Sequence, residues 1–370
     1  MRGHTRLEIS WASLAHNWSL VQSLAPRARV LPMIKADAYG HGLVPLGKFF
    51  AEEMRAQALG VATLGEAEAL SLALPNFKGR IYVFSDTLVT EKAFHARYKS
   101  HAILPVIADL ASLEVFLSDG CFRHLPLTLK LNTGMNRLGI PEAQWPAAVE
   151  LIARAGRRSV QHLMSHFACA AQPLAPGDQN HLQAQSFGRA LALLRAAGLV
   201  IEETSLANSG AVEQGLAVEE TWVRPGLMLY GPVSFATPTR LASRLVTQVM
   251  RVFPVKRGEH VGYGGAVVPQ DGEMALLPIG YGDGFVTQSS GQEWAFGEVR
   301  GSVFGRVNMD MSFLYFTGEH VGKVREGMEL ELWGADGHGR LEAWARHCGT
   351  HAYQALCGIS SRVPRVYRLE

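Results

Sequence analysis

The stretch Val30-Leu-Pro-Met-Ile-Lys35-Ala-Asp-Ala-Tyr39-Gly-His-Gly42 joins an apolar run to a lysine and a glycine-containing turn. A short continuous apolar run is typical of a strand buried on both faces, as in a parallel sheet. Lys35 then stands at the carboxyl end of that strand, which in a (β/α)8 barrel opens into the active-site mouth. Partial burial there disfavours the ammonium form, so the amine becomes a candidate nucleophile. The alternative is a solvated lysine at a strand end, which position alone favours.

Segments of the same form continue along the chain from about residue 11 to about residue 235. Short apolar runs predict strands at Val30–Ile34, Leu59–Ala62, Ile81–Phe84, Leu127–Leu131, His162–Ser165 and Trp222–Val223. Longer stretches with helical spacing predict helices that include Leu64–Leu74, Ala147–Ala155 and Leu182–Ala197. Roughly eight such units over ~225 residues favour a (β/α)8 barrel, with a doubly wound sheet as the alternative. The region Ala93–Asp119 is ambiguous.

Residues 236–370 have a different pattern, which predicts a second, mostly-β domain. Short β-rich segments are separated by glycine-containing turns, which is typical of antiparallel sheets. These segments are Leu245–Val255, Met274–Pro278, Val299–Phe304 and Met328–Trp333. The single expected helix is Leu341–Cys348. At the other end of the chain, Arg6–Ser10 alternates like a strand and could pair with either domain.

Composition excludes several classes of function. The 370 residues are 48% hydrophobic and 18% charged, which is typical of a globular chain with a sizeable core. A formal charge of +2 gives no reason to expect a nucleic-acid partner. The four cysteines lack C-x-x-C spacing, so neither a metal site nor a disulfide framework is expected. No secretory h-region and no membrane-spanning stretch is visible, which indicates a cytoplasmic protein.

Two further strand ends carry side chains that are expected to face the same mouth as Lys35. The run Leu127–Leu131 delivers Lys130, and Arg137 follows after a glycine-containing turn. The planar fork of a buried arginine suits a carboxylate or a phenolate. The run His162–Ser165 delivers His166. A surface arginine and a structural histidine are the alternatives, and neither residue decides the matter alone.

A phosphate site is expected at the last strand ends of the barrel. Ala207-Asn208-Ser209-Gly210 stands at the start of an expected helix, where free backbone N–H groups can hold a phosphate. The same residues are equally suited to an ordinary N-cap. Val223-Arg224-Pro-Gly226 follows in a loop that frequently binds phosphate in such barrels. A lysine, an arginine, a histidine and a phosphate cradle at one mouth suit pyridoxal phosphate.

The residues around Lys35 also resemble a known family. Ile34-Lys35-Ala-Asp-Ala-Tyr39-Gly-His-Gly42 is similar to the cofactor-lysine signature of the alanine racemases. Further similar segments follow in order at Lys130–Gly139, Ser165–Ala168, Asn208–Ser209, Arg224–Gly231, Val261–Gly265, Gly280–Gly284, Gly305–Met311 and Ser361–Arg365. The resemblance implies a fold type III enzyme with a (β/α)8 barrel over 11–235 and a β domain over 236–370. It also implies a homodimer whose active sites are completed across the interface.

The resemblance assigns a role to individual residues. Lys35 would be the Schiff-base lysine of pyridoxal 5'-phosphate and one catalytic base, and Tyr263 of the partner subunit would be the other. The remaining cofactor-binding positions are Tyr39, His166, Asn208, Ser209, Arg224, Gly226, Leu227 and Tyr353. The resemblance places Arg137 and Met309 at the substrate carboxylate. It implies that Lys130 is a carbamylated lysine that holds Arg137. Tyr281 and Arg306 would line the entryway to the site. No metal is implied.

The function implied by the resemblance is the interconversion of L-alanine and D-alanine, which supplies D-alanine for peptidoglycan. Racemisation needs bases on opposite faces of the α-carbon, which Lys35 and Tyr263 would provide. Asn132 and Asn308 stand where many members carry aspartate and cysteine. A racemase of broader or serine specificity is the nearest alternative. A non-catalytic pyridoxal-phosphate-binding protein shares only the barrel, so the β domain argues against it.

Overall fold

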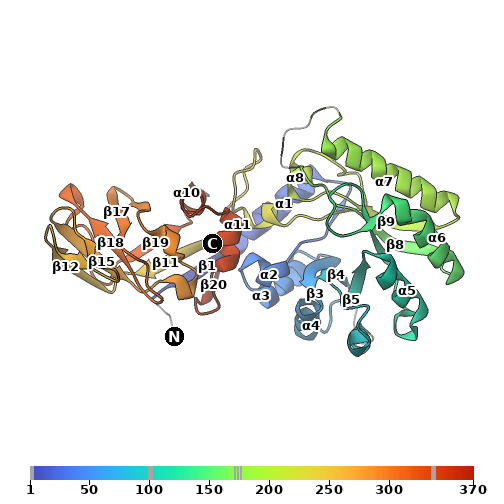
Figure 1. Cartoon of the computed structure of the whole chain (residues 1–370), viewed down its shortest axis with the longest axis horizontal. Helices are drawn as coiled ribbons and strands as arrows, with labels where there is room; N and C mark the ends of the chain where they lie inside the picture. The colour runs from blue at the N-terminus through green and yellow to red at the C-terminus, as the bar shows by residue number, and fades with distance from the viewer. Residues whose placement is uncertain (1–3, 99–102, 171, 173–174, 176, 335–338) are drawn as a thin grey trace.

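The structure is a computed structural model that describes residues 4–98, 103–170, 172, 175, 177–334 and 339–370. Figure 1 shows an elongated molecule with two lobes, in which strands and covering helices form one lobe and a β-rich lobe lies at the other end. The chain crosses between the lobes near its beginning and again after the barrel. The two lobes therefore meet in the middle of the molecule.

Parallel strands form a closed ring in the first lobe. The ring consists of β2 (Arg29–Val30), β3 (Ala58–Thr63), β4 (Arg80–Asp86), β5 (Ile103–Ile107), β6 (Thr128–Asn132), β8 (Ser159–Met164), β9 (Val200–Ser205) and β10 (Trp222–Val223). Strands β3 to β9 pair side by side in chain order, and β10 pairs with β2. A bridge between Met33 and Gly60 joins β2 to β3, and the Arg224 amide donates to the Ala207 carbonyl at 2.9 Å to join β10 to β9. The expected (β/α)8 barrel is confirmed.

Helices cover the outside of this ring, as the alternating pattern predicted. They include α1 (Trp11–Leu24), α3 (Leu43–Lys48), α4 (Leu64–Ala73), α5 (Leu110–Ser118), α6 (Trp145–Arg154) and α7 (Gln179–Ala196). The ambiguous region Ala93–Asp119 contains most of a 3₁₀ helix (Lys92–Tyr98), strand β5 and helix α5, so it supplies one unit of the barrel. Asp109 caps α5 by accepting a hydrogen bond from the Ser112 amide at 2.8 Å.

The second lobe contains two main sheets. One has the order β19 (Glu329–Trp333), β11 (Ser243–Gln248), β1 (Arg6–Ser10), β20 (Arg365–Arg368). The other has the order β12 (Arg251–Val255), β15 (Gly272–Leu277), β18 (Ser312–Phe316), β17 (Val299–Phe304), β16 (Glu293–Phe296). The expected single segment Leu245–Val255 is therefore two strands in different sheets. The expected helix is α10 (Gly339–His347), and a second helix, α11 (Ala352–Gly358), was missed.

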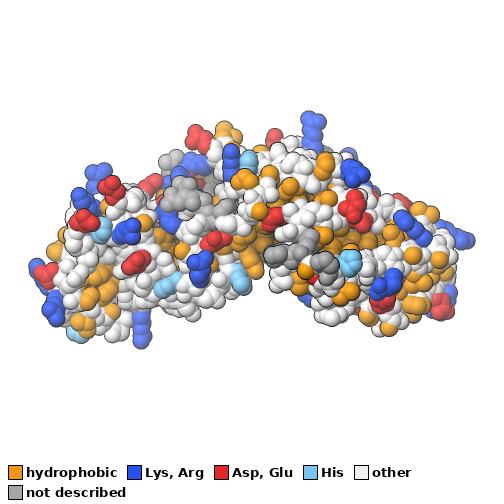
Figure 2. All heavy atoms as spheres, turned by 90° about the horizontal axis from the view of Figure 1, so that it is seen from above, with side chains coloured by type: hydrophobic (Ala, Val, Ile, Leu, Met, Phe, Trp, Pro, Cys, Tyr) orange, Lys and Arg blue, Asp and Glu red, His pale blue; other side chains and the backbone are white. Residues whose placement is uncertain are grey.

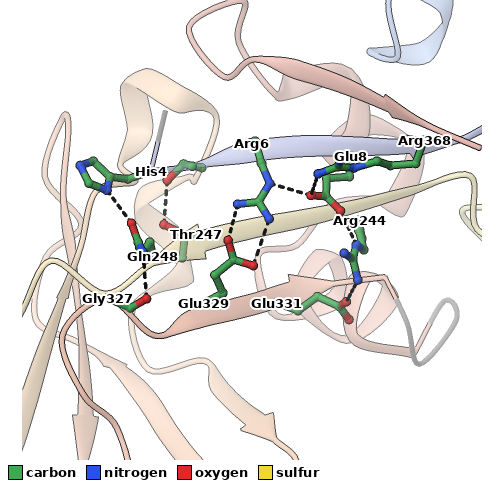
Figure 3. Close-up of polar contacts among 11 residues, drawn as sticks. His4, Arg6, Glu8, Arg244, Thr247, Gln248, Gly327, Glu329, Glu331 and Arg368 are labelled. Carbon is green, nitrogen blue, oxygen red and sulfur yellow. Dashed lines mark hydrogen bonds and ion pairs between the residues drawn. The ribbon is translucent and has the colours of Figure 1, made fainter. Parts of the chain in front are cut away.

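The first strand of the chain belongs to the second lobe. Strand β1 pairs antiparallel with β11 and parallel with β20. Figure 3 shows the ion pairs that run across this sheet. Glu8, 2% exposed, accepts hydrogen bonds from Arg6 at 2.6 Å, Arg244 at 2.6 Å and Arg368 at 2.9 Å. The Arg6 fork also donates to Glu329 at 2.8 and 3.0 Å. Ion pairs thus link all four strands.

The arginines around Glu8 change its titration. Burial alone raises the pKa of Glu8, but the hydrogen bonds from Arg368, Arg6 and Arg244 outweigh burial and lower the pKa from 4.5 to about 2. A buried carboxylate is costly unless such partners surround it. Glu8 therefore stabilises the sheet only while it is ionised.

The outer surface carries charges of both signs. On the face drawn in Figure 2, the basic and acidic side chains are interspersed rather than gathered into separate areas. Such a surface does not attract polyanions over long distances. Within the described part of the chain, none of the helices has both the length and the apolar character needed to span a bilayer.

We expect Glu8→Gln to lower the free energy of unfolding by about 3 kcal/mol at pH 7, because three arginines lose their buried carboxylate. The folded-state pKa lies below the ordinary value, so this contribution is present above pH 4.5 and is lost as the pH falls toward 2. Urea unfolding at several pH values measures both effects. Glu298→Gln, at an exposed position in the β16–β17 turn, is the control. An equal response of the two variants would contradict the assignment.

Candidate active site

Lys35 is followed by a left-handed turn at the mouth of the barrel. It begins the short helix α2 (Lys35–Tyr39), in which the next four residues have φ of 53° to 54°. Non-glycine residues rarely adopt this conformation, which costs roughly 1–2 kcal/mol per residue. Strain of this kind persists only where the surroundings hold it, and it is concentrated at functional sites.

Barrel residues hold one side of the turn. Glu66 Oε1 accepts a hydrogen bond from the Ala36 amide at 2.7 Å. Asp37 Oδ1 accepts one from the Leu43 amide, also at 2.7 Å, and so ties the turn to the start of α3. Each contact pairs a carboxylate with a backbone N–H, which is stronger than a bond between neutral groups.

The second lobe holds the other side of the turn. Arg365 Nε donates to the Gly40 carbonyl at 3.0 Å, and the Tyr367 hydroxyl donates to the His41 carbonyl at 2.9 Å. His41 is fully buried, and burial lowers its pKa to about 4, so its ring is neutral near pH 7. Its Nδ1 lies 2.9 Å from the Tyr39 carbonyl and must carry the proton. The Ser243 hydroxyl therefore donates to Nε2 at 3.0 Å.

The predicted cations come together at the mouth. Lys130 is only 6% exposed, and burial together with the charges of Arg224, Arg137 and Lys35 lowers its pKa to about 7. Burial and Arg137 also lower the pKa of Lys35, which Glu66 and Cys357 partly oppose. The strand ends named from the sequence thus deliver their side chains to one place.

Arg224 is buried without an acidic partner among the groups it contacts. Its guanidinium donates to the Ser205 hydroxyl, to the Ser165 carbonyl at 2.5 Å and to His166 Nδ1 at 3.2 Å. These acceptors are all uncharged. Burial lowers the pKa of Arg224 to about 10, so it keeps its charge at neutral pH. Burial, followed by the charge of Arg224, places the pKa of His166 well below its usual range, so that ring is neutral.

Hydroxyl groups and backbone amides form a cradle beside the cations. Ser209 Oγ accepts hydrogen bonds from the Gly226 amide at 2.9 Å and the Met228 amide at 3.1 Å. A side chain at Gly226 is excluded, because its Cβ would lie 2.3 Å from the Tyr39 hydroxyl oxygen. Asn208 caps α8 (Ser209–Glu213) by accepting from the Ala211 amide at 3.1 Å. Leu227 follows Gly226 as the first residue of α9 (Leu227–Tyr230).

This set of groups fits a small aromatic ligand with several negative charges. The cations at the mouth favour an anion, the Tyr39 hydroxyl lies against the Gly226 backbone, and a lysine amine with a lowered pKa suits imine formation. Pyridoxal phosphate has these properties. The residues that could hold its phosphate are Tyr39, Asn208, Ser209, Gly226 and Leu227.

The remaining predicted residues lie in the second lobe. Tyr263, Tyr281 and Arg306 line a pocket of about 420 Å³ whose other walls also come from that lobe. Tyr263 is 72% exposed and Met309 is 52% exposed. The single chain therefore does not bring these side chains to Lys35. Tyr353 lies on α11, which packs beside α2 where the lobes meet and places its ring on that of His351 at 5.3 Å.

Two residues near Lys35 were missed from the sequence. Glu66 stands in Thr63-x-x-Glu66, a capping-box pattern that predicts the start of α4 but gives no hint of its contact with Ala36. Cys357 lies close enough to Lys35 to raise its pKa. No signal pointed to Cys357, because the short helix α11 that carries it was itself missed.

Comparison with known proteins gives matches over the whole chain. The model of the alanine racemase N-terminal domain matches residues 9–233, and that of the alanine racemase C-terminal domain matches residues 242–367. The alanine racemase of Alcanivorax borkumensis is 33% identical over 386 residues, with 99% of each chain covered. That of Pseudomonas taetrolens is 34% identical over 372 residues, with 98% of each chain covered.

Solved structures are similar over the same length. The alanine racemase from Streptomyces coelicolor has a TM-score of 0.84 at 31% identity, covering 99% of this chain and 98% of its own. The biosynthetic alanine racemase from Pseudomonas aeruginosa has a TM-score of 0.81 at 30% identity, with both chains fully covered. The arrangement of barrel and β domain is thus shared with these proteins.

We expect the side chain of Lys130 to lose its proton near pH 7, because it is buried among three cations. The amine should therefore be mostly neutral above that pH. The ¹³Cε resonance of lysine-labelled protein, assigned by its loss in Lys130→Met, measures the midpoint. A lysine model peptide, with an ordinary pKa near ~10.4, is the reference. A Lys130 midpoint equal to that of the peptide would contradict the cation cluster.

Proposed function

The chain belongs to the alanine racemase family and interconverts L-alanine and D-alanine. We propose that the reaction uses one base from each of two protomers. Lys35 of one protomer and Tyr263 of the partner subunit are these bases. The observation that carries the proposal is the division of the site between the lobes. The cations and the phosphate cradle surround Lys35 at the barrel mouth, whereas Tyr263 is presented outward on the other lobe.

The cofactor of this proposal is pyridoxal 5'-phosphate. When bound, it supplies an aldehyde that joins to an amine and a ring that takes up the electrons left when the α-proton departs. Lys35 provides the amine. The hydroxyls of Tyr39 and Ser209 and the amides around Gly226 would hold the phosphate, with Tyr353 reaching in from α11.

Proton transfer at the α-carbon falls to the two bases. Burial and Arg137 lower the pKa of Lys35, which increases the fraction of free amine able to accept a proton at Nζ. Lys35 takes the α-proton of D-alanine, and the Tyr263 hydroxyl oxygen takes that of L-alanine. Each base acts on its own face of the α-carbon, so removal on one face and return on the other inverts the centre.

Arg224 and His166 set the charge next to the ring. Arg224 stays charged, and a second positive charge beside it is disfavoured, so a ring nitrogen facing it would remain unprotonated. The neutral ring of His166 lies between two donors, the Arg224 guanidinium 3.2 Å from Nδ1 and the Asn208 amide nitrogen 3.4 Å from Nε2.

Arg137 and Lys130 would bind the substrate carboxylate end. The guanidinium of Arg137 donates two parallel hydrogen bonds to a carboxylate. The amine of Lys130 is half neutral near pH 7 and can attack carbon dioxide, releasing one proton and forming a carbamate. This step replaces a neutral amine by an anion among three cations. The carbamate would pair with Arg137 and hold it in position.

The outward-facing side chains of the second lobe support a homodimer. Tyr263, Met309 and Tyr281 are 72%, 52% and 46% exposed, and the two tyrosines line one pocket. A second copy that places its barrel mouth over this surface would complete two equal sites, since a two-fold interface repeats every contact. The D-alanine formed would serve peptidoglycan synthesis.

We expect Lys35→Ala to lose the visible absorbance of the bound cofactor and to lose racemisation by at least about 10²–10⁴-fold, because both the imine and one base disappear. Absorbance spectra and D-alanine formation from L-alanine measure the two effects. Lys48→Ala, on the exposed face of the following helix, is the control and should resemble the wild type. A coloured, active Lys35→Ala protein would overturn the proposal.

We expect Tyr263→Phe to keep the cofactor absorbance and lose racemisation in both directions by about 10²–10⁴-fold, because the base for L-alanine is gone. Exchange of the α-proton of D-alanine with deuterium oxide should persist, because Lys35 remains. Mass spectrometry of each enantiomer measures the exchange. Equal loss of exchange from both enantiomers would contradict the assignment of one base to each face.

The same two variants test whether Tyr263 acts across the interface. Dissociating and reassociating an equal mixture of Lys35→Ala and Tyr263→Phe protomers gives mixed dimers in which one site has both bases. Activity should return to about a quarter of the wild-type value, because half of the dimers are mixed and each has one intact site. No recovery in verified mixed dimers would place both bases in the same chain.

A further inference from the structure

Glu66 occupies the start of α4, where it forms an ordinary capping box. The Thr63 hydroxyl oxygen accepts from the Glu66 amide at 3.2 Å, and Glu66 Oε2 accepts from the Thr63 amide at 3.2 Å. The same oxygen accepts from the Ala62 amide at 2.8 Å. These three bonds satisfy amides at the end of β3 and the beginning of the helix. They leave the second carboxylate oxygen, Oε1, with no part in the cap.

That second oxygen makes a contact outside the helix. Glu66 Oε1 accepts from the Ala36 amide at 2.7 Å, the shortest of the bonds to this carboxylate. The Ala36 amide belongs to the peptide bond that follows Lys35, and Ala36 is the first residue of the left-handed turn, with φ of 54°. One carboxylate therefore connects a helix that is fixed in the barrel wall to the backbone of the proposed catalytic lysine.

We propose that Glu66 is a positioning residue for Lys35, holding the peptide plane after the lysine and so the direction in which its side chain leaves the backbone. The inference rests on the proposed role of Lys35. A carboxylate is required because both oxygens accept from backbone N–H groups. A glutamine would turn its NH₂ group toward one of these donors and lose that bond.

The charge of Glu66 has a second effect on Lys35. It raises the pKa of the lysine, against burial and Arg137, which lower it. The groups that face Lys35 come from every element around it and are Arg137, Glu66, Cys357, Lys130 and His166. Of these, His166 is neutral. Glu66 is the first of the groups that raise the pKa of Lys35. Removing that charge should lower the pKa of Lys35 further.

Three variants separate this role from helix capping. Glu66→Gln removes the charge and one of the two acceptors. Glu66→Asp keeps the charge but is one methylene shorter and cannot span both the cap and the Ala36 amide. Thr63→Ala is the matched control, since it breaks the same capping box without touching Ala36. All three should lower the melting temperature by a few degrees, because each disturbs the start of α4.

The measurements are steady-state racemisation and the attachment of pyridoxal 5'-phosphate to cofactor-free protein, followed by visible absorbance across pH. We expect kcat to fall by about 10-fold or more in Glu66→Gln and Glu66→Asp with little change in KM, because a misdirected base affects the chemical step more than binding. The pH midpoint for attachment should move downward in Glu66→Gln. It should stay near the wild-type value in Glu66→Asp and in Thr63→Ala, whose kcat should also be retained.

The inference is overturned if Glu66→Gln and Thr63→Ala show the same kcat and the same midpoint. If Glu66→Gln does not accumulate as folded protein, the kcat of Glu66→Asp relative to Thr63→Ala decides in the same way. The Lys35→Ala variant separates this result from the proposed function. If Lys35→Ala is active, the proposed catalytic role of Lys35 is wrong. If Lys35→Ala is inactive and Glu66→Gln has the kcat and pH midpoint of Thr63→Ala, only the positioning role of Glu66 is wrong.

Discussion

The left-handed turn after Lys35 is the constraint on which the rest of the site depends. Four consecutive non-glycine residues at φ of 53° to 54° cost roughly 4–8 kcal/mol together, at about 1–2 kcal/mol each. Local backbone hydrogen bonds, such as that from the Gly40 amide to the Ala36 carbonyl at 3.0 Å, offset part of this cost, and contacts from the two lobes add to them. Glu66 holds it from the barrel, and Arg365 and Tyr367 hold it from the β domain. The two lobes of one chain therefore act together on the backbone of a single lysine.

A second constraint is the accumulation of positive charge at the barrel mouth. Lys130 is surrounded by Arg224, Arg137 and Lys35, and Arg224 contacts only uncharged acceptors. Such an arrangement disfavours the folded state until an anion binds. A ligand that binds only the folded state stabilises it by an amount that grows with the logarithm of the ligand concentration divided by Kd. The cation cluster thus links the binding of an anion to the stability of the barrel.

The sequence predicted the parts of the structure that depend on local pattern. Apolar runs placed most barrel strands, and the polar residues after them placed Lys35, Lys130 and His166 at one mouth. The turn was out of reach because Ala-Asp-Ala-Tyr contains no glycine, so local preference gives no sign of left-handed backbone. The sequence predicted strands β11 and β12 as one segment, because the local residue pattern does not show that the chain passes from one sheet to another between them. Glu66 was readable as a cap, but its bond to Ala36 joins residues 30 positions apart.

Strand β1 has a consequence for how the protein is made. Its hydrogen-bonding partners β11 and β20 come much later in the chain, and the bond between Arg368 and Glu8 joins residues 360 positions apart. On the ribosome, the first strand emerges long before its neighbours and stays without them while the whole barrel is synthesised. An unpaired strand edge of this kind invites aggregation. Glu8 and Arg6 place charges along the unpaired edge of β1. The residues that later form ion pairs across the sheet therefore also protect the nascent chain from aggregation.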